Sequence, residues 1–393
     1  MSDESLLLAV TGQPVFHSLS PELFRILLKI SGVAASYTRL AAASAEEALR
    51  LFSELGLDGM NVTAPFKEGV RALLGELGGD AALLGAVNCV ARRPDGGLYG
   101  DSSDPSGVGA SLKAAGVRVG GRRCLVIGAG GAGKSAALAL VREGASVEVV
   151  NRSVDRSDAF FGELGCGMAG LDLLAERAAS ADIIVSTLAS ANLPPIEAWF
   201  PRGASRRTGE DALVVFDADY REGLLHRHAK AAGCLALSGL GWLIHQALPA
   251  FELFVGRRAA AIDPALIESE LRDHDRARRK GRRGLALFGA SAELNAKIAS
   301  RLAPSLGLPQ AKGGEVFKDT APRGQDIVSL DEADLADAAS MDVIRKDHAV
   351  ILLYGKGRGG IPLAGSPDLV MPCAGRGADE IAEWIHEEVA QLL

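Results

Sequence analysis

A short apolar run that breaks into glycines constrains the fold of this chain more than any other stretch. Residues 123–127 read as a strand, residues 128–135 as a glycine turn that ends in Gly-Lys-Ser, and the alanine-rich residues 136–142 as a helix. Glycines let the backbone approach a phosphate, and the N–H groups at a helix start hold the anion. The fold predicted around this turn is therefore α/β, with a doubly wound parallel sheet.

Two phosphate-binding patterns overlap in the turn. Gly128, Gly130 and Gly133 fit the G-x-G-x-x-G pattern of dinucleotide-binding folds, and the closing Gly-Lys-Ser also fits the P-loop of kinases and ATPases. A P-loop protein needs a magnesium-binding aspartate after an apolar strand, whereas Asp182 stands before its strand. We therefore favour the dinucleotide site, with a P-loop, or a turn that binds nothing, as the alternatives.

The tip of the next strand indicates which dinucleotide binds. A carboxylate there would bind the ribose of NAD, whereas an arginine accommodates the 2′-phosphate of NADP. The strand at residues 146–150 ends without a carboxylate and is followed by arginines. The predicted cofactor is NADP, bound by Gly128, Gly130, Gly131, Ala132, Gly133, Asn151, Arg152, Ser153 and Arg156.

Composition limits the remaining classes. A chain of 393 residues predicts two or three domains, and 48% hydrophobic with only 5% aromatic residues suits α/β layers. The net charge of −7 argues against general nucleic-acid binding. No apolar run has transmembrane length and the first residues are acidic, so we expect neither a membrane span nor a signal peptide. Five scattered cysteines indicate reduced thiols in a cytoplasmic protein.

Several polar side chains lie beside helix starts in the first hundred residues. Ser20 precedes Pro21 and is predicted to cap a helix, which leaves Ser18 unexplained; two neighbouring hydroxyls would also suit a substrate carboxylate. Lys67 lies near another helix start, where the dipole disfavours a positive charge, and such a lysine suits proton transfer. Taken alone, this position favours the alternative of an ordinary surface lysine, but Lys67 is followed by further strands and loops with polar tips. Asp104 is predicted to cap a helix from Val108.

Together these motifs resemble the shikimate dehydrogenase family over about residues 5–260. The motifs are Ser18-Leu19-Ser20, Asn-Val-Thr-Ala-Pro-Phe-Lys at 61–67, Gly-Ala-Val-Asn at 85–88, Asp104 with Gly107, the glycine turn, Asn-Arg-Ser at 151–153, and Gly-Leu-Gly-Trp-Leu-Ile-His-Gln at 239–246. The resemblance implies reversible NADP-dependent reduction of 3-dehydroshikimate to shikimate, in chorismate and aromatic amino acid biosynthesis.

The resemblance also implies roles for particular residues. Lys67 with Asp104 would act at the reacting oxygen as the catalytic pair. Ser18 and Ser20 would bind the carboxylate of the substrate. The remaining substrate-binding residues would be Asn61, Thr63, Asn88, Tyr220 and Gln246, and Gly239 and Trp242 would lie beside the cofactor.

The chain departs from the family pattern at four places, one of which is the loop after Tyr220, where the expected Pro and Thr are absent. Ser102-Ser103 replaces the usual Asn-Thr before Asp104, Ser186-Thr187-Leu188 replaces Asn-Ala-Thr, and Trp242 replaces a methionine. A related cyclohexene acid, such as a dehydroquinate or an aminoshikimate, is therefore an alternative substrate. A non-catalytic sensor that binds NADP and a shikimate-like acid is an alternative of another class, and a homodimer is left open.

We expect a substrate lobe at 1–110 completed by a helix at 243–262, a Rossmann domain at 111–242, a charged linker at 263–283 and a small α/β domain at 284–393. The basic run in the linker is read as solvated rather than as a nucleic-acid patch. The last domain loosely resembles a degenerate shikimate kinase without a complete phosphate loop, and we expect an inactive phosphotransferase-like or oligomerising module. Residues 356–360 form either an anion-binding turn or a plain loop.

Overall fold

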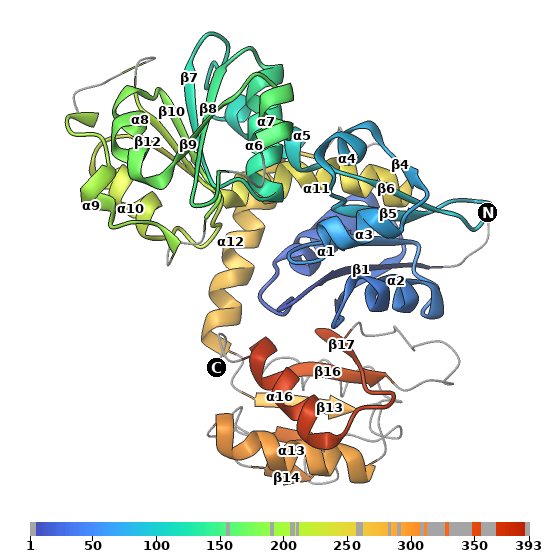
Figure 1. The fold of residues 1–393 in the computed structure, drawn as a ribbon. Helices are drawn as coiled ribbons and strands as arrows, with labels where there is room; N and C mark the ends of the chain where they lie inside the picture. The colour runs from blue at the N-terminus through green and yellow to red at the C-terminus, as the bar shows by residue number, and fades with distance from the viewer. Residues whose placement is uncertain are drawn as a thin grey trace. The chain divides into compact units, whose positions relative to one another are not determined.

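The computed structural model describes residues 5–154, 158–188, 192–204, 209, 212–256, 262–281, 284–288, 292–306, 310–312, 327–329, 348–354 and 367–389. The chain divides into two compact units (Figure 1): the first contains residues 1–75, 89–99 and 269–393, and the second contains residues 76–88 and 100–268. This division assigns residues 284–393 to the same unit as the first 75 residues. In the part of the chain that is described, no helix is long and apolar enough to cross a membrane.

The N-terminal part of the first unit is an α/β sheet. Strand β1 pairs in parallel with β2 and with β3, and β3 pairs antiparallel with β5. Most apolar side chains of β1, α1 and α2 are buried, with Ile30 of α1 as an exposed exception. The elements are β1 (Leu6–Gly12), α1 (Ser20–Ser31), β2 (Ala35–Ala41), α2 (Ala45–Glu54), β3 (Gly59–Val62), α3 (Lys67–Leu73) and β5 (Cys89–Arg92).

The C-terminal part of the first unit continues this sheet. Its strands are parallel in the order β14-β15-β13-β16-β17, and β17 then pairs with β2 at Val370 and Leu40. Helices α13 and α16 pack against each other (Figure 1). The elements are β13 (Gly284–Phe288), α13 (Ala292–Leu306), β14 (Gln310–Lys312), β15 (Ile327–Ser329), β16 (His348–Tyr354), β17 (Leu369–Pro372) and α16 (Ala378–Val389).

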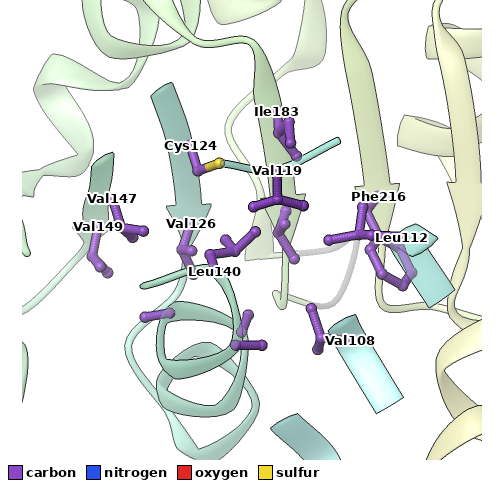
Figure 2. Packing of buried hydrophobic residues seen from close by; sticks show 14 of the residues in the cluster. Val108, Leu112, Val119, Cys124, Val126, Leu140, Val147, Val149, Ile183 and Phe216 are labelled. Atoms are coloured by element: carbon purple, nitrogen blue, oxygen red, sulfur yellow. The ribbon is translucent and has the colours of Figure 1, made fainter. Parts of the chain in front are cut away.

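The second unit has a six-stranded sheet in the order β12-β11-β10-β7-β8-β9, and its strand pairs are parallel. Buried aliphatic side chains of the strands pack against Leu140 of α6 (Figure 2). The doubly wound sheet predicted around the glycine turn is confirmed. Its strands are β7 (Arg123–Ile127), β8 (Ser146–Asn151), β9 (Gly167–Gly170), β10 (Ile183–Ser186), β11 (Val214–Asp217) and β12 (Leu235–Ser238).

The longest helix that lies wholly within the second unit, α11, packs against α5. A Cβ added at Gly107 of α5 would lie 2.7 Å from Trp242 Cδ1 and 2.7 Å from Gln246 Cβ, so glycine permits this close approach. The helices are α4 (Gly79–Leu84), α5 (Asp104–Ala114), α6 (Gly131–Arg142), α7 (Asp158–Glu163), the 3-10 turn η1 (Leu171–Leu173), α8 (Leu174–Ser180), α9 (Ile196–Trp199), α10 (Leu224–Ala231), α11 (Gly239–Val255) and α12 (Pro264–Gly281). Strand β4 spans Glu76–Leu77 and β6 spans Leu98–Asp101. Helix α12 and strand β6 each contain residues of both units.

Three expected helix starts are wrong. Helix α1 begins at Ser20 with Leu19 as its N-cap, and α5 begins at Asp104 with Ser103 as its N-cap, so neither Ser20 nor Asp104 caps its helix. In both cases the proline lies one residue later than the first helical residue, which leaves the polar side chain inside the first turn. Helix α11 begins at Gly239 rather than at residue 243, where the completing helix was expected.

Candidate active site

The glycine turn connects β7 to α6 in the second unit. Gly128 has a φ of 104°, a conformation that favours glycine, and a Cβ at Gly133 would collide with the carbonyl oxygen of Gly128. Gly130 is the N-cap of α6, and a Cβ added there would meet no atom within 4 Å. The turn therefore brings the helix start close to the strand and leaves space at Gly130, which fits a bound pyrophosphate.

The tip of β8 presents the residues expected to bind the adenosine ribose. The Asn151 side chain donates to the Ser153 carbonyl oxygen at 2.8 Å, which closes a tight turn. Arg152 and Ser153 are exposed, so the guanidinium is accessible to a phosphate. Arg156 lies outside the described residues.

A buried polar cluster lies at the contact of α5 and α11. The side-chain nitrogen of Asn88 lies 2.9 Å from Asp104 Oδ1 and 3.1 Å from Gln246 Oε1. Ser103 joins the cluster twice, because its backbone N–H donates to Asn88 Oδ1 at 2.9 Å and its hydroxyl donates to Gln246 Oε1 at 3.2 Å. The second unit thus brings three predicted substrate or catalytic residues together, with Ser103 as a fourth member.

The first unit brings together the residues expected at the substrate carboxylate. Ser18 and Ser20 are buried, and the Ser18 hydroxyl donates to Ser20 Oγ at 3.2 Å. The Ser20 backbone N–H donates to Ser18 Oγ, with a nitrogen-to-oxygen distance of 3.3 Å. Two hydroxyls and a helix start at one place can bind an anionic oxygen pair.

Asn61 is held by a residue that the sequence did not single out. The hydroxyl of Tyr37, on β2, donates to Asn61 Oδ1 of β3 at 2.7 Å, across the intervening strand β1. Burial raises the pKa of Tyr37 well above its usual value, so the hydroxyl keeps its proton and remains a donor. This bond fixes the orientation of the Asn61 amide.

Lys67 is the first residue of α3 and is half-buried. It follows Thr63 by one turn, which contains the cis peptide bond between Ala64 and Pro65. Thr63 is anchored to the end of β1, because its backbone N–H donates to the Thr11 carbonyl oxygen at 2.9 Å. Lys67 and Thr63 therefore stand at the carboxyl end of the strands β1 and β3.

The remaining predicted residues lie at the carboxyl ends of β11 and β12. A Cβ at Gly239 would collide with the Ala218 carbonyl oxygen, so this position requires glycine. The backbone nitrogen of Tyr220 would lie 3.1 Å from the same Cβ, so Gly239 is close to Tyr220. Trp242 is buried, with its ring 5.9 Å from the Phe216 ring. Among the described residues no group of three or more His, Cys, Asp or Glu side chains could hold a metal ion.

Comparison with known proteins decides the family. Residues 10–90 match the shikimate dehydrogenase substrate-binding domain, and residues 111–218 match the shikimate/quinate 5-dehydrogenase domain. The shikimate dehydrogenase (NADP(+)) of Acidiphilium cryptum (strain JF-5) is 35% identical over 279 residues, which cover 70% of this chain and 98% of the relative. The chain belongs to the shikimate dehydrogenase family. The predicted resemblance is confirmed, as is the predicted enzyme class, an NADP-dependent oxidoreductase of the shikimate dehydrogenase type.

Solved structures of family members share the fold. Shikimate 5-dehydrogenase from Thermus thermophilus, in complex with NADP(H) and shikimate, has a TM-score of 0.58 and 33% identity over 68% of this chain and 99% of its own. Quinate dehydrogenase from Corynebacterium glutamicum, in complex with NAD, has a TM-score of 0.58 and 27% identity over 68% of this chain and 99% of its own. The family match also decides between the two phosphate-binding patterns in favour of the dinucleotide pattern.

The two matched domains end at residue 218, so the loose likeness of residues 284–393 to a shikimate kinase has no support from them. The expected turn at 356–360 lies outside the described residues. Sequence reasoning missed Tyr37 and gave Ser103 no role. Both could have been found only from the long-range pairing that places them next to Asn61 and Asn88.

Proposed function

We propose that this dehydrogenase catalyses the reversible reduction of the ketone of 3-dehydroshikimate to shikimate with NADP(H), in chorismate biosynthesis. The observation that supports this most directly is the buried cluster of Asn88, Asp104 and Gln246, because its amides and carboxylate offer both donors and acceptors to a hydroxylated ring. A relative of 35% identity that carries the name shikimate dehydrogenase (NADP(+)) supports the same substrate.

In this proposal Lys67 is the acid and base of the reaction. NADPH, when bound, would supply the hydride for the carbonyl carbon. The carbonyl oxygen of the substrate then gains negative charge, and the Lys67 ammonium stabilises that charge and donates the proton. Asp104 is the carboxylate partner that orients the ammonium and the hydroxyl that is formed.

Two groups of residues would orient the ring. Ser18 and Ser20 would donate to the substrate carboxylate, which fits their burial and their 3.2 Å separation. The residues proposed to bind the ring hydroxyls are Asn61, Thr63, Asn88, Tyr220 and Gln246.

The cofactor contacts follow from the glycine turn and the tip of β8. The space at Gly130 would hold the pyrophosphate, and the exposed Arg152 would donate to the 2′-phosphate of NADP. Gly131, Ala132 and Gly133 contribute the first turn of α6, while Gly239 and Trp242 would border the nicotinamide.

An absorbance assay of NADPH oxidation with a panel of cyclohexene ketones tests this function. We expect 3-dehydroshikimate to be reduced with the highest kcat/KM. Preference for a dehydroquinate or an aminoshikimate precursor would instead support the alternative substrates, which Ser103 in the cluster motivates. Tight binding of NADPH and shikimate without turnover would support the sensor.

The assembly and compartment are also proposals. The described cysteines are free thiols, which fits a cytoplasmic enzyme. We propose an oligomerising role for residues 284–393. Size-exclusion chromatography with light scattering would test whether the protein forms a homodimer.

A further inference from the structure

The loop at residues 13–19, between β1 and α1, carries Ser18 and leads directly to Ser20. It contains the cis peptide bond between Gln13 and Pro14, and its backbone makes a local bond from Ser18 N–H to the Val15 carbonyl oxygen at 3.0 Å. Its other backbone groups need partners from elsewhere in the chain, because a buried N–H without a partner is costly.

One side of this loop is held by Arg39 of β2. The Arg39 side chain is fully buried and bonds both oxygens of Glu22, at 2.7 and 2.9 Å. Its Nε donates to the Ser18 carbonyl oxygen at 3.1 Å. Arg39 Nη1 also donates to the carbonyl oxygen of Asp368, just before β17, at 3.3 Å.

The other side of the loop is held by Glu388 of α16, near the end of the described chain. Glu388 Oε2 accepts the backbone N–H of Val15 at 2.7 Å and that of Phe16 at 2.9 Å. The residue is only 2% exposed. Burial raises the pKa of Glu388, while the two N–H donors oppose this shift. The two hydrogen bonds therefore offset part of the cost of burying the carboxylate.

Further bonds fix α16 and β17 to the same unit. The Thr38 hydroxyl donates to the Pro367 carbonyl oxygen at 2.7 Å, next to the pairing of β17 with β2. Arg376 forms an ion pair with Glu47 of α2 at 2.9 Å, with both side chains mostly buried. Glu388 is therefore presented to the loop by a segment that is anchored on two other elements.

We propose that Glu388 is a positioning residue for substrate binding, through which the C-terminal segment 367–389 orders the loop that presents Ser18 and Ser20 to the substrate carboxylate. This inference rests on the proposed function for the identity of the substrate. Under this proposal residues 367–389 contribute to substrate binding by the dehydrogenase. Because the carboxylate of the substrate is remote from the reacting carbon, loosening the loop should weaken binding of substrate more than chemistry.

Steady-state kinetics of the full-length protein tests the proposal with three substitutions. Glu388→Ala removes both acceptors and Glu388→Asp withdraws the carboxylate by one methylene, so each should raise the KM for 3-dehydroshikimate about tenfold, the scale set by ordering one or two residues. The kcat and the KM for NADPH should change less than about twofold. Glu388→Gln keeps an oxygen for both N–H groups and should restore the KM, and Glu387→Ala, at an exposed neighbour on α16, is the matched control.

Hydrogen exchange of the same proteins, followed by mass spectrometry, reads the loop without any substrate. Peptides that contain Val15 and Phe16 should exchange faster in Glu388→Ala and Glu388→Asp than in the wild type, and at the wild-type rate in Glu388→Gln. Unchanged exchange in Glu388→Asp would overturn the ordering role. Faster exchange with an unchanged KM would overturn the role in substrate binding.

The two proposals can fail separately. If the wild type does not reduce 3-dehydroshikimate, the proposed function is wrong, and with it the substrate assigned to the loop, while hydrogen exchange still decides whether Glu388 orders residues 13–19. If the wild type reduces it and the Glu388 variants behave as the wild type in both assays, only the positioning role is wrong.

Discussion

The side-chain nitrogen of Asn88 lies 2.9 Å from Oδ1 of Asp104, inside the second unit. Both residues are buried, and Asp104 occupies the first turn of α5, where the helix dipole favours a negative charge. The bond fixes the direction of the carboxylate before any substrate binds. A carboxylate that is held in this way is suited to orient an ammonium group or a hydroxyl, as the proposed function requires.

Asp104→Asn should lower kcat for 3-dehydroshikimate by about 100-fold or more, because the substitution keeps the size of the side chain and removes its charge. Asp95→Asn, at an exposed turn where the side chain accepts the Gly97 backbone N–H, is the control and should leave kcat unchanged. Stopped-flow or steady-state absorbance of NADPH gives the values. Equal kcat in the two variants would remove Asp104 from the catalytic pair.

Gly133→Ala and Gly130→Ala separate packing of the glycine turn from cofactor binding. A Cβ at Gly133 would collide with the Gly128 carbonyl oxygen, so Gly133→Ala should lower the free energy of unfolding by about 1–3 kcal/mol. A Cβ at Gly130 meets open space, so Gly130→Ala should keep the stability and weaken NADPH binding instead. Urea unfolding and fluorescence titration measure the two effects, and equal losses of stability would contradict this account.

Arg152→Ala should raise the KM for NADPH about tenfold or more and leave the KM for NADH nearly unchanged, because one charge-assisted bond to the 2′-phosphate is lost. Arg202→Ala, at another exposed arginine of the second unit, serves as the comparison. A parallel rise of both KM values would mean that Arg152 contacts a part common to the two cofactors.

Asp217→Asn should change the pH dependence of stability. Burial raises the pKa of Asp217, although the Asp219 backbone N–H donates to it at 3.1 Å. The folded state therefore holds the proton more tightly than the unfolded state, and the free energy of unfolding falls as the pH rises from the ordinary carboxyl pKa to the raised one. At pH 7 Asp217→Asn should be the more stable protein, by about 1.4 kcal/mol for each unit of the shift, and the difference should shrink in acid. Urea unfolding at about pH 3 to 7 measures this, and a difference that grows in acid would reverse the assignment.

Local signals predicted much of the second unit. The strands predicted at 123–127 and 146–150 are short apolar runs next to glycines or turns, and a parallel sheet buried on both faces requires that pattern. Strand β2 was missed because Tyr37 and Arg39 interrupt its apolar pattern. Both are buried, and their partners, Asn61 and Glu22, lie far away in the sequence.

The bonds between the proposed site residues could not be predicted from the sequence. The resemblance to the family suggested Asn88, Asp104 and Gln246, yet their mutual bonds depend on the packing of α11 against α5, which no local pattern encodes. The contacts of Glu388 could not be predicted for the same reason, since this residue lies 373 residues from Val15 and 372 from Phe16 in the sequence.

The most direct test of the central assignment is the rate of NADPH oxidation with saturating 3-dehydroshikimate, compared between the wild type and Lys67→Ala. The account predicts turnover by the wild type and a kcat that falls by about 10²–10⁴-fold in the variant, with NADPH affinity retained. No turnover by the wild type, or a Lys67→Ala variant that keeps the wild-type kcat, would contradict it.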